Sequence, residues 1–202
     1  MPRVARIVVP EIAHHVVQRG NRRQDVFFNS RDYQKYLELM SEKLNEAGSD
    51  LIAYCLMTNH VHLVVIPKDE SGLRPVGEAH RLYTRYVNFR EGWRGYLWQG
   101  RFSSYPLSDK HLYEVIRYVE LNPVRAALVS CPEDYKYSSA AFRLSEERHP
   151  LFSKLHKPNA MIDDWRAYWQ EGLDKDFEKN LIEQHQINQN PLGNIPPLSG
   201  TQ

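Results

Sequence analysis

Two histidines separated by one residue, His60 and His62, have the types and spacing that most directly suggest chemistry in this sequence. They lie in the run HVHLVVI, whose β-branched and aliphatic content is typical of a β-strand. Alternate residues of a strand point to the same face of a sheet, so both imidazoles leave one face, roughly 7 Å apart at the backbone. Such a pair can bind one divalent metal ion. It can equally be two strand histidines that are hydrogen-bonded in the core, since each ring has a donor and an acceptor.

A second pair of polar residues, Tyr118 and Asn122, is spaced four residues apart on a predicted helix and therefore shares one flank of it. If that flank packs over the sheet face that carries His60 and His62, two imidazole nitrogens, an amide oxygen and a phenol meet. The first three would leave positions open for water and a phosphate oxygen, as Lewis-acid catalysis on a phosphodiester requires, and Tyr118 would be the nucleophile. Tyr113 lies on the opposite flank. The alternative for Tyr118 is an ordinary tyrosine at the protein boundary.

The elements that must position these residues follow the order strand, helix, strand, strand, helix, strand, helix. This order predicts an α+β fold of the ferredoxin-like, split β-α-β kind, with an antiparallel sheet and helices packed on one face. The last helix is expected to end at residue 121 or 122, because Pro123 follows. The predicted strands are residues 12–18, 51–57, 61–66 and a glycine- and aromatic-rich stretch over 92–107, and the predicted helices are 30–47, 73–90 and 109–122.

The signal weakens toward the C-terminus, and we divide the chain into a catalytic domain over residues 1–145 and an extension over 146–202. Short helices are predicted at 137–144, 163–170 and 174–186. The last fifteen residues are rich in proline, glycine and asparagine, and we expect them to be disordered.

The composition is that of one globular domain: 202 residues, 42% hydrophobic and 25% charged, with a net charge of +1. The first 130 residues carry 18 basic and 14 acidic side chains, and arginines outnumber lysines there. Arginine pairs with phosphates and stacks on bases, so this bias suits nucleic acid. The lack of a long apolar run or secretory segment predicts no membrane span, and two isolated cysteines suit a reducing cytoplasm.

Four sequence blocks in order, HHVVQRGNRR, YCLMTNHVHLVV, LWQGRF and RYVELNPVRAALV, followed by DYKYSS, cover about residues 10–143. In these blocks the chain resembles the REP-associated tyrosine transposases, relatives of the single-tyrosine transposases of small bacterial insertion sequences within the HUH nuclease superfamily. The resemblance implies a bacterial cytoplasmic protein, associated with the nucleoid when bound to DNA.

The resemblance also implies an activity and a set of site residues. His60 and His62 would be the HUH pair, Asn122 the third ligand of Mg²⁺ or Mn²⁺, and Tyr118 the nucleophile. The reaction would be cleavage and strand transfer of single-stranded DNA beside a hairpin, with a 5′-phosphotyrosine intermediate and a free 3′-hydroxyl. Only one of His14 and His15 can face the metal, and neither is included among the ligands.

Candidate DNA-binding residues occur in three groups. A polar loop after the first strand has arginines that can clamp phosphates, and the 98–102 segment interleaves flat rings with a cation, as in surfaces on which unpaired bases stack. A pair of arginines one turn apart forms a basic ridge on a helix. Core packing of the rings and a solvated helix face are the alternatives. The residues are Arg19, Asn21, Arg22, Arg23, Arg81, Arg85, Trp98, Gln99 and Arg101.

Two other functions compete with the strand transferase. A palindrome- or hairpin-binding regulatory protein derived from a transposase would bind DNA without cleaving it. An RNA-binding ferredoxin-like domain would need stacking aromatics on the sheet face, where His60 and His62 are expected instead. A monomer is slightly favoured over a homodimer by the resemblance.

Overall fold

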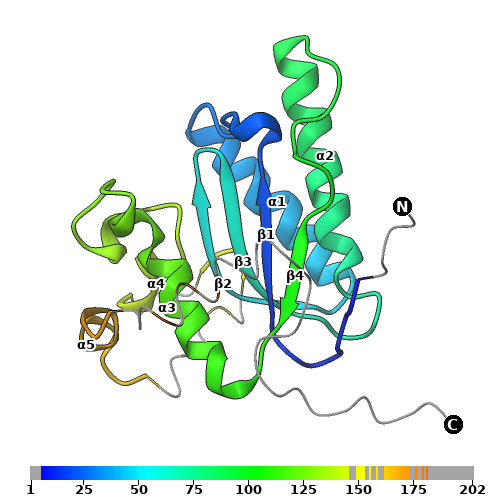
Figure 1. Ribbon diagram of the computed structural model, residues 1–202. Coiled ribbons are helices and arrows are strands. Elements are labelled where there is room, and N and C mark those ends of the chain that lie inside the picture. The colour runs from blue at the N-terminus through cyan, green and yellow to red at the C-terminus, as the bar shows by residue number, and fades with distance from the viewer. Residues whose placement is uncertain are drawn as a thin grey trace, which may run out of the picture.

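The structure is a computed structural model that describes residues 6–145, 149–152, 155, 158, 162–172, 176, 179 and 181. A four-stranded antiparallel sheet with the strand order β2-β3-β1-β4 forms its centre (Figure 1). The α+β, split β-α-β prediction is confirmed. The elements are β1 (His14–Arg19), α1 (Ser30–Glu46), β2 (Asp50–Met57), β3 (His60–Ile66), α2 (Arg74–Glu91), β4 (Ser103–Pro106) and α3 (Asp109–Arg125).

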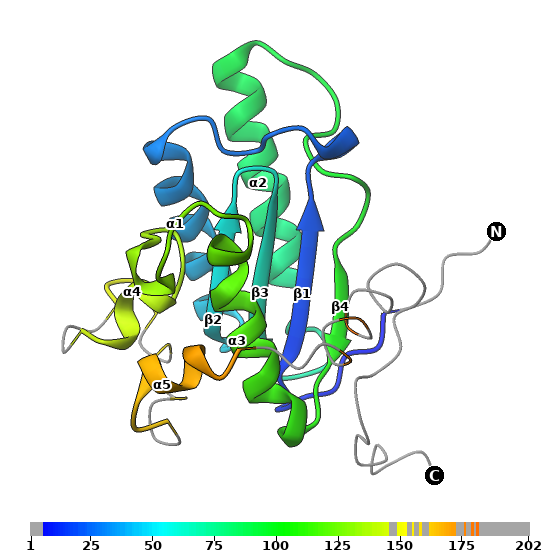
Figure 2. The same cartoon turned by 60° about the vertical axis from the view of Figure 1, so that its left-hand side comes forward.

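The alternation along β3 sorts its side chains between two cores. Val61, Leu63 and Val65 pack with α1 and α2, whereas Val64 belongs to a second cluster with residues of α3. Figure 2 shows α1 and α2 behind the sheet and α3 in front of it. The two helices of the split β-α-β unit thus share one face, and the helix that follows the unit crosses the other face.

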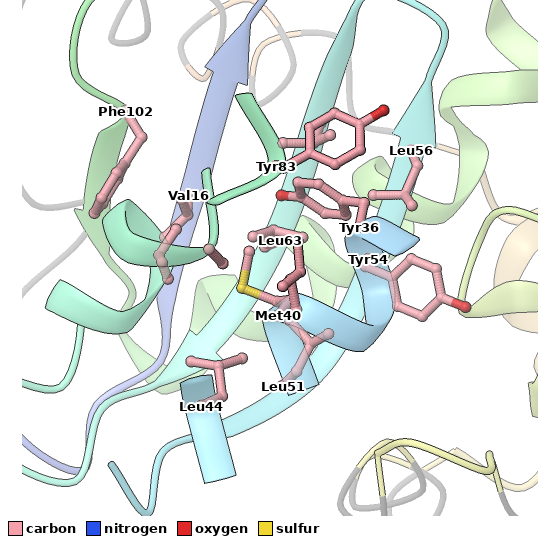
Figure 3. Close-up of a cluster of buried hydrophobic side chains, with 14 of the residues drawn as sticks. Val16, Tyr36, Met40, Leu44, Leu51, Tyr54, Leu56, Leu63, Tyr83 and Phe102 are labelled. Carbon is pink, nitrogen blue, oxygen red and sulfur yellow. The ribbon is translucent and has the colours of Figure 1, made fainter. Parts of the chain in front are cut away.

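Local sequence explains the helices of the first layer. The side chain of Asn29 caps α1 by accepting a hydrogen bond from the backbone N–H of Asp32 at 3.2 Å. Tyr36, Met40 and Leu44 then recur at helical spacing and point at the sheet, where Figure 3 shows them packed against side chains of β2 and β3.

The predicted end of α3 before Pro123 is wrong, because the helix continues to Arg125. A proline within a helix leaves the carbonyl four residues earlier without its usual N–H donor. Here the side-chain Nδ2 of Asn122 donates to the carbonyl of Tyr118 at 2.8 Å and lies 3.5 Å from that of Val119. The amide thus bonds chiefly to Tyr118, and it lies only at the limit of hydrogen-bond distance from the Val119 carbonyl that Pro123 leaves without its backbone donor.

The stretch predicted as a fourth strand over residues 92–107 is strand only at β4. Its earlier part is a loop, which is fixed to the end of β1 by a bridge between Gly20 and Trp98 and by hydrogen bonds from Asn21 N to Leu97 O and from Gln99 N to Arg19 O, both 2.8 Å. This loop and the basic turn after β1 are therefore held side by side.

The C-terminal segment packs on both cores through side chains such as Phe152 and Trp165. It contains α4 (Ala140–Arg143) and α5 (Trp165–Gln170), within two of the predicted short helices. The predicted helix over 174–186 lies largely outside the described residues, and the last fifteen residues lie wholly outside them. Among the residues that the structure describes, no helix is both long and apolar enough to cross a membrane.

Buried neutral histidines predict that the fold loses stability in mild acid. Burial, with a further contribution from the charge of Arg6, lowers the pKa of His80 to about 3, and burial lowers that of His14 to about 4. An unfolded histidine has a pKa of about 6.5, so as the pH falls below that value the unfolded chain takes up protons first and is favoured. This contribution to stability is complete above about pH 6.5 and is lost progressively toward pH 3.

We expect chemical denaturation to show this loss between pH 6.5 and pH 4, with His80 alone contributing about 3 kcal/mol to the fall in the free energy of unfolding. The His80→Phe variant removes the titrating group and should therefore show a flatter pH dependence. A slope equal to that of the wild-type chain would contradict the assignment.

Candidate functional site

His60 and His62 lie side by side on the sheet face that α3 covers. Their ring centroids are 5.1 Å apart and their planes are nearly perpendicular. The Nδ1 atom of His60 lies 2.6 Å from Oδ1 of Asn59, and Nδ1 of His62 lies 3.0 Å from Nε2 of His15. Each imidazole therefore has a hydrogen-bond partner at Nδ1, as metal-binding histidines usually have at the ring nitrogen that does not coordinate.

His60 is kept neutral by its surroundings. Burial, and then the positive charge of Arg19, lowers the pKa of His60 to about 4. Arg19 stands opposite His60 in the pairing of β1 with β3. A neutral imidazole has a lone pair to offer, so His60 is in the protonation state that metal binding needs at neutral pH.

Tyr118 packs directly against the histidines. Its ring centroid lies 5.6 Å from that of His62 and 6.0 Å from that of His15, in both cases edge to face. The side chain is only 6% exposed. Asn122 follows one turn later on α3 and is also buried. The structure thus brings the phenol to the paired imidazoles, and the amide lies on the same flank of the helix.

Arg125 adds a charge that the sequence analysis missed. Its guanidinium carbon lies over the Tyr118 ring, 4.9 Å from the centroid. Arg125 is seven residues after Tyr118, two helical turns along the same flank, so the spacing was a signal that could have indicated it. A guanidinium at this place can bind a phosphate oxygen.

The opposite flank of α3 faces away from the histidines. Arg117, one turn after Tyr113, donates to the carbonyl of Gly172 at 2.9 Å and stacks on the ring of Tyr168. The carbonyl of Tyr113 accepts a hydrogen bond from the hydroxyl of Tyr168. This flank therefore serves the contact with the C-terminal segment.

The donor atoms of the predicted ligands are of types that divalent cations accept. Across the described parts of the chain, no three His, Cys, Asp or Glu side chains come together as a metal site. His60, His62 and Asn122 offer two imidazole nitrogens and an amide oxygen, all uncharged. Neutral ligands leave the positive charge of the cation undiminished, so a bound phosphate would supply much of the compensating charge.

The predicted DNA-binding residues do not gather at one place. Arg19 lies beside His60, whereas Arg81, Arg85, Trp98 and Arg101 line a pocket of about 900 Å³ between α2 and the 93–102 loop. Gln18, the β1 neighbour of Arg19 that faces the other side of the sheet, also lines it. Trp98 is itself buried and donates through Nε1 to the carbonyl of His80, so it builds the wall and offers little surface.

The exposed aromatic rings of this region are residues that the sequence analysis did not single out. Tyr96 is 86% exposed, and Phe89 and Trp93 accompany it on the pocket rim. Arg6 and Arg74 add two more guanidinium groups, and that of Arg6 lies over Phe102, 3.6 Å from the ring centroid. The pocket therefore combines positive charge with flat apolar surface.

The basic turn after β1 borders a smaller hollow of about 320 Å³, next to the large pocket. Gly20 is required at the start of this turn, because a Cβ atom there would lie 2.1 Å from the carbonyl oxygen of Gln24. Asn21 and Arg22 line the hollow together with Arg94. Arg23 and Gln99 are exposed nearby and line neither hollow.

The sequence and the fold are similar to those of known proteins. Residues 8–122, more than half of the chain, match the family model described as "Transposase IS200 like". A solved REP-associated tyrosine transposase bound to a REP hairpin is 17% identical, with a TM-score of 0.62 over 75% of this chain and 90% of that one. A Deinococcus radiodurans R1 protein assigned as a transposase is also 17% identical, with a TM-score of 0.41 over 59% and 96% of the two chains. No curated protein sequence matches. The chain belongs to the family of IS200-like transposases.

Proposed function

We propose that this transposase is a metal-dependent, single-tyrosine endonuclease and strand transferase that acts on single-stranded DNA at hairpins. The observation that carries the proposal is the packing of the Tyr118 ring against His62, with His60 alongside and Arg125 above the phenol. A nucleophile, two candidate ligands and a cation are thereby gathered at one place in a chain of this family.

In this proposal His60, His62 and Asn122 hold the divalent cation, Mg²⁺ or Mn²⁺. When bound, the cation supplies Lewis-acid chemistry by drawing charge from the non-bridging oxygens of the scissile phosphate. Arg19 and Arg125 orient the same phosphate by charge-assisted hydrogen bonds.

Tyr118 performs the covalent step. Its phenol loses a proton and its oxygen attacks phosphorus, while the bond from phosphorus to the 3′-oxygen breaks and that oxygen takes up a proton. The products are a 5′-phosphotyrosine and a free 3′-hydroxyl. Because one phosphoester replaces another, a second 3′-hydroxyl can reverse the step without an external energy source.

DNA binding is assigned to the pocket beside α2 and to the turn after β1. Guanidinium groups that track the backbone, with exposed rings on which bases stack, are the features of surfaces that bind single strands. The similarity to the solved protein bound to a REP hairpin supports hairpin DNA as the substrate class.

A second candidate is a hairpin-binding regulatory protein that does not cleave. The deep burial of Tyr118 favours it, since a phenol that is 6% exposed must be uncovered before it meets a phosphate. An RNA-binding domain is disfavoured because α3 covers the sheet face that would have to stack bases.

The test is to incubate the chain with a labelled hairpin flanked by single strands, with and without Mn²⁺, and to look for a denaturation-resistant protein–DNA adduct. We expect an adduct that requires the metal and the single-stranded flank. Tight hairpin binding without any adduct across native flanking palindromes would support the regulatory protein instead.

If the pocket arginines bind DNA phosphates, replacing them should weaken the dependence of DNA affinity on salt concentration. In an Arg81→Gln/Arg85→Gln double variant, the slope of the logarithm of the DNA-binding constant against the logarithm of salt concentration should become less negative. The expected change is about 0.7 for each phosphate contact that is lost. Arg166→Gln is the matched control, because Arg166 is an exposed arginine of α5, paired with Glu133 and absent from the pocket lining. Equal salt slopes for the double variant and the wild-type chain would contradict this placement.

A further inference from the structure

A third histidine, His15, stands directly behind His62. It is fully buried on β1, its Nε2 lies 3.0 Å from Nδ1 of His62, and the two rings are nearly coplanar, with centroids 5.2 Å apart and an interplanar angle of 22°. The strand register explains the contact. Val17 is paired with His62, and His15 is the diagonal neighbour on the same sheet face.

A hydrogen bond between two imidazoles can run in either direction, and the direction decides what His62 can bind. If Nδ1–H of His62 donates to Nε2 of His15, the Nε2 atom of His62 carries a lone pair and can coordinate a metal. If Nε2–H of His15 donates instead, the proton of neutral His62 sits on Nε2 and blocks coordination. The state of His15 thus sets the ligand competence of His62.

His60 has a partner that permits only one direction. The amide oxygen of Asn59 beside its Nδ1 atom can accept but not donate, so the proton of neutral His60 stays on Nδ1. For His62 to carry its proton on Nδ1 as well, Nε2 of His15 must accept the hydrogen bond from Nδ1–H of His62. In that arrangement both histidines of the pair present Nε2 to the same cation.

We propose that His15 is a positioning residue, which accepts a hydrogen bond from Nδ1–H of His62 and so fixes His62 in the tautomer that binds metal through Nε2. The metal part of this inference rests on the proposed function. The tautomer itself is a property of the metal-free chain and is measurable without cleavage. Tyr118 also packs on His15, edge to face, with the ring centroids 6.0 Å apart.

Nitrogen-15 NMR of the histidine side chains in the metal-free wild-type chain tests the tautomer directly. We expect His62 to be protonated at Nδ1. Protonation of His62 at Nε2 would overturn the proposal. This measurement uses only the wild-type chain, so it does not depend on whether any variant folds.

Two substitutions separate positioning from packing. In His15→Gln the amide oxygen can reach the place of Nε2 and accept, whereas His15→Phe keeps a ring of similar shape without an acceptor. We expect His15→Phe to shift His62 toward the Nε2–H tautomer and to weaken Mn²⁺ binding, followed by electron paramagnetic resonance, about 10- to 100-fold. His15→Gln should retain the wild-type tautomer and most of the affinity.

His14→Phe is the matched control, because His14 is a buried histidine of the same strand whose Nδ1 contacts the carbonyl of Ile12 and whose Nε2 accepts from the N–H of Val9. It should leave the His62 tautomer unchanged. Equal Mn²⁺ affinity and tautomer in His15→Phe and His15→Gln would overturn the proposal. If the wild-type chain binds no Mn²⁺ but the tautomer still depends on His15, the metal part of the proposed function fails and the positioning role stands.

Discussion

Replacing Tyr118 by phenylalanine should abolish the covalent DNA adduct and leave hairpin binding intact. The substitution removes only the phenol oxygen, while the ring that packs on His62 and under Arg125 is kept. Loss of the nucleophile in an enzyme that works through a covalent intermediate costs roughly 10⁴-fold or more in rate. The measurement compares adduct yield on a denaturing gel with hairpin affinity by fluorescence anisotropy.

Tyr113→Phe is the control for this prediction. Tyr113 is on the same helix, but its flank packs toward Tyr168 and the C-terminal segment. We expect this variant to form the adduct at the wild-type rate. An adduct that persists in Tyr118→Phe would show that another residue is the nucleophile.

Arg143→Met should lower the free energy of unfolding by about 3–5 kcal/mol, because it leaves the buried carboxylate of Glu120 without its charged partner. The Nε atom of Arg143 lies 2.8 Å from Oε1 of Glu120, and both side chains are essentially inaccessible to solvent. The same carboxylate accepts from Ser139 Oγ at 2.6 Å and from Trp169 Nε1 at 3.0 Å. Arg143 also donates to the carbonyl of Ile52 at 2.8 Å.

This ion pair connects α3 to the sheet through the carbonyl of Ile52 and to the C-terminal segment through Trp169. Glu120 lies between Tyr118 and Asn122 on α3. Its loss should therefore also reduce adduct formation at temperatures where the variant remains folded. Arg166→Gln is again the control, because its pair with Glu133 is exposed on the arginine side and should be worth less than about 1 kcal/mol. A chemical denaturation curve for Arg143→Met within 1 kcal/mol of the wild-type curve would contradict the prediction.

The layout of the fold was predictable because its local signals agree. The observed elements were indicated by a cap at Ser30 or Asn29, of which the structure uses Asn29, by the helical spacing of Tyr36, Met40 and Leu44, and by the tight break between β2 and β3. The proline rule failed at Pro123, because the helix continues through the proline to Arg125 even though residues before a proline disfavour the helical conformation.

The site was only partly predictable. Period-two alternation places His60 and His62 on one face, and the four-residue spacing places Tyr118 and Asn122 on one flank. Whether that flank meets that face depends on which side of the sheet α3 crosses, and no local pattern determines this. His15 was omitted because its contact with His62 depends on strand register, which links residues 47 positions apart.

The DNA-binding assignment was limited for a similar reason. Composition indicated arginines and aromatic rings in the 81–102 region, but it did not indicate which rings are buried in the pocket wall and which are exposed at its rim. Trp98 is inside, whereas Tyr96 and Phe89 are the exposed rings. The roles assigned to these residues, like the monomeric state and the division at residue 145, stay predictions.

The central claim, that Tyr118 attacks the phosphate beside the paired histidines, is tested most directly by locating the adduct in the sequence. Trypsin cuts after Lys110, Arg117 and Arg125, so Tyr118 is the only tyrosine of the 118–125 peptide and Tyr113 the only one of the 111–117 peptide. After the adduct is digested with nuclease and trypsin, mass spectrometry should find the added nucleotide phosphate on the 118–125 peptide. A nucleotide on the 111–117 peptide, or on any other, would contradict the account.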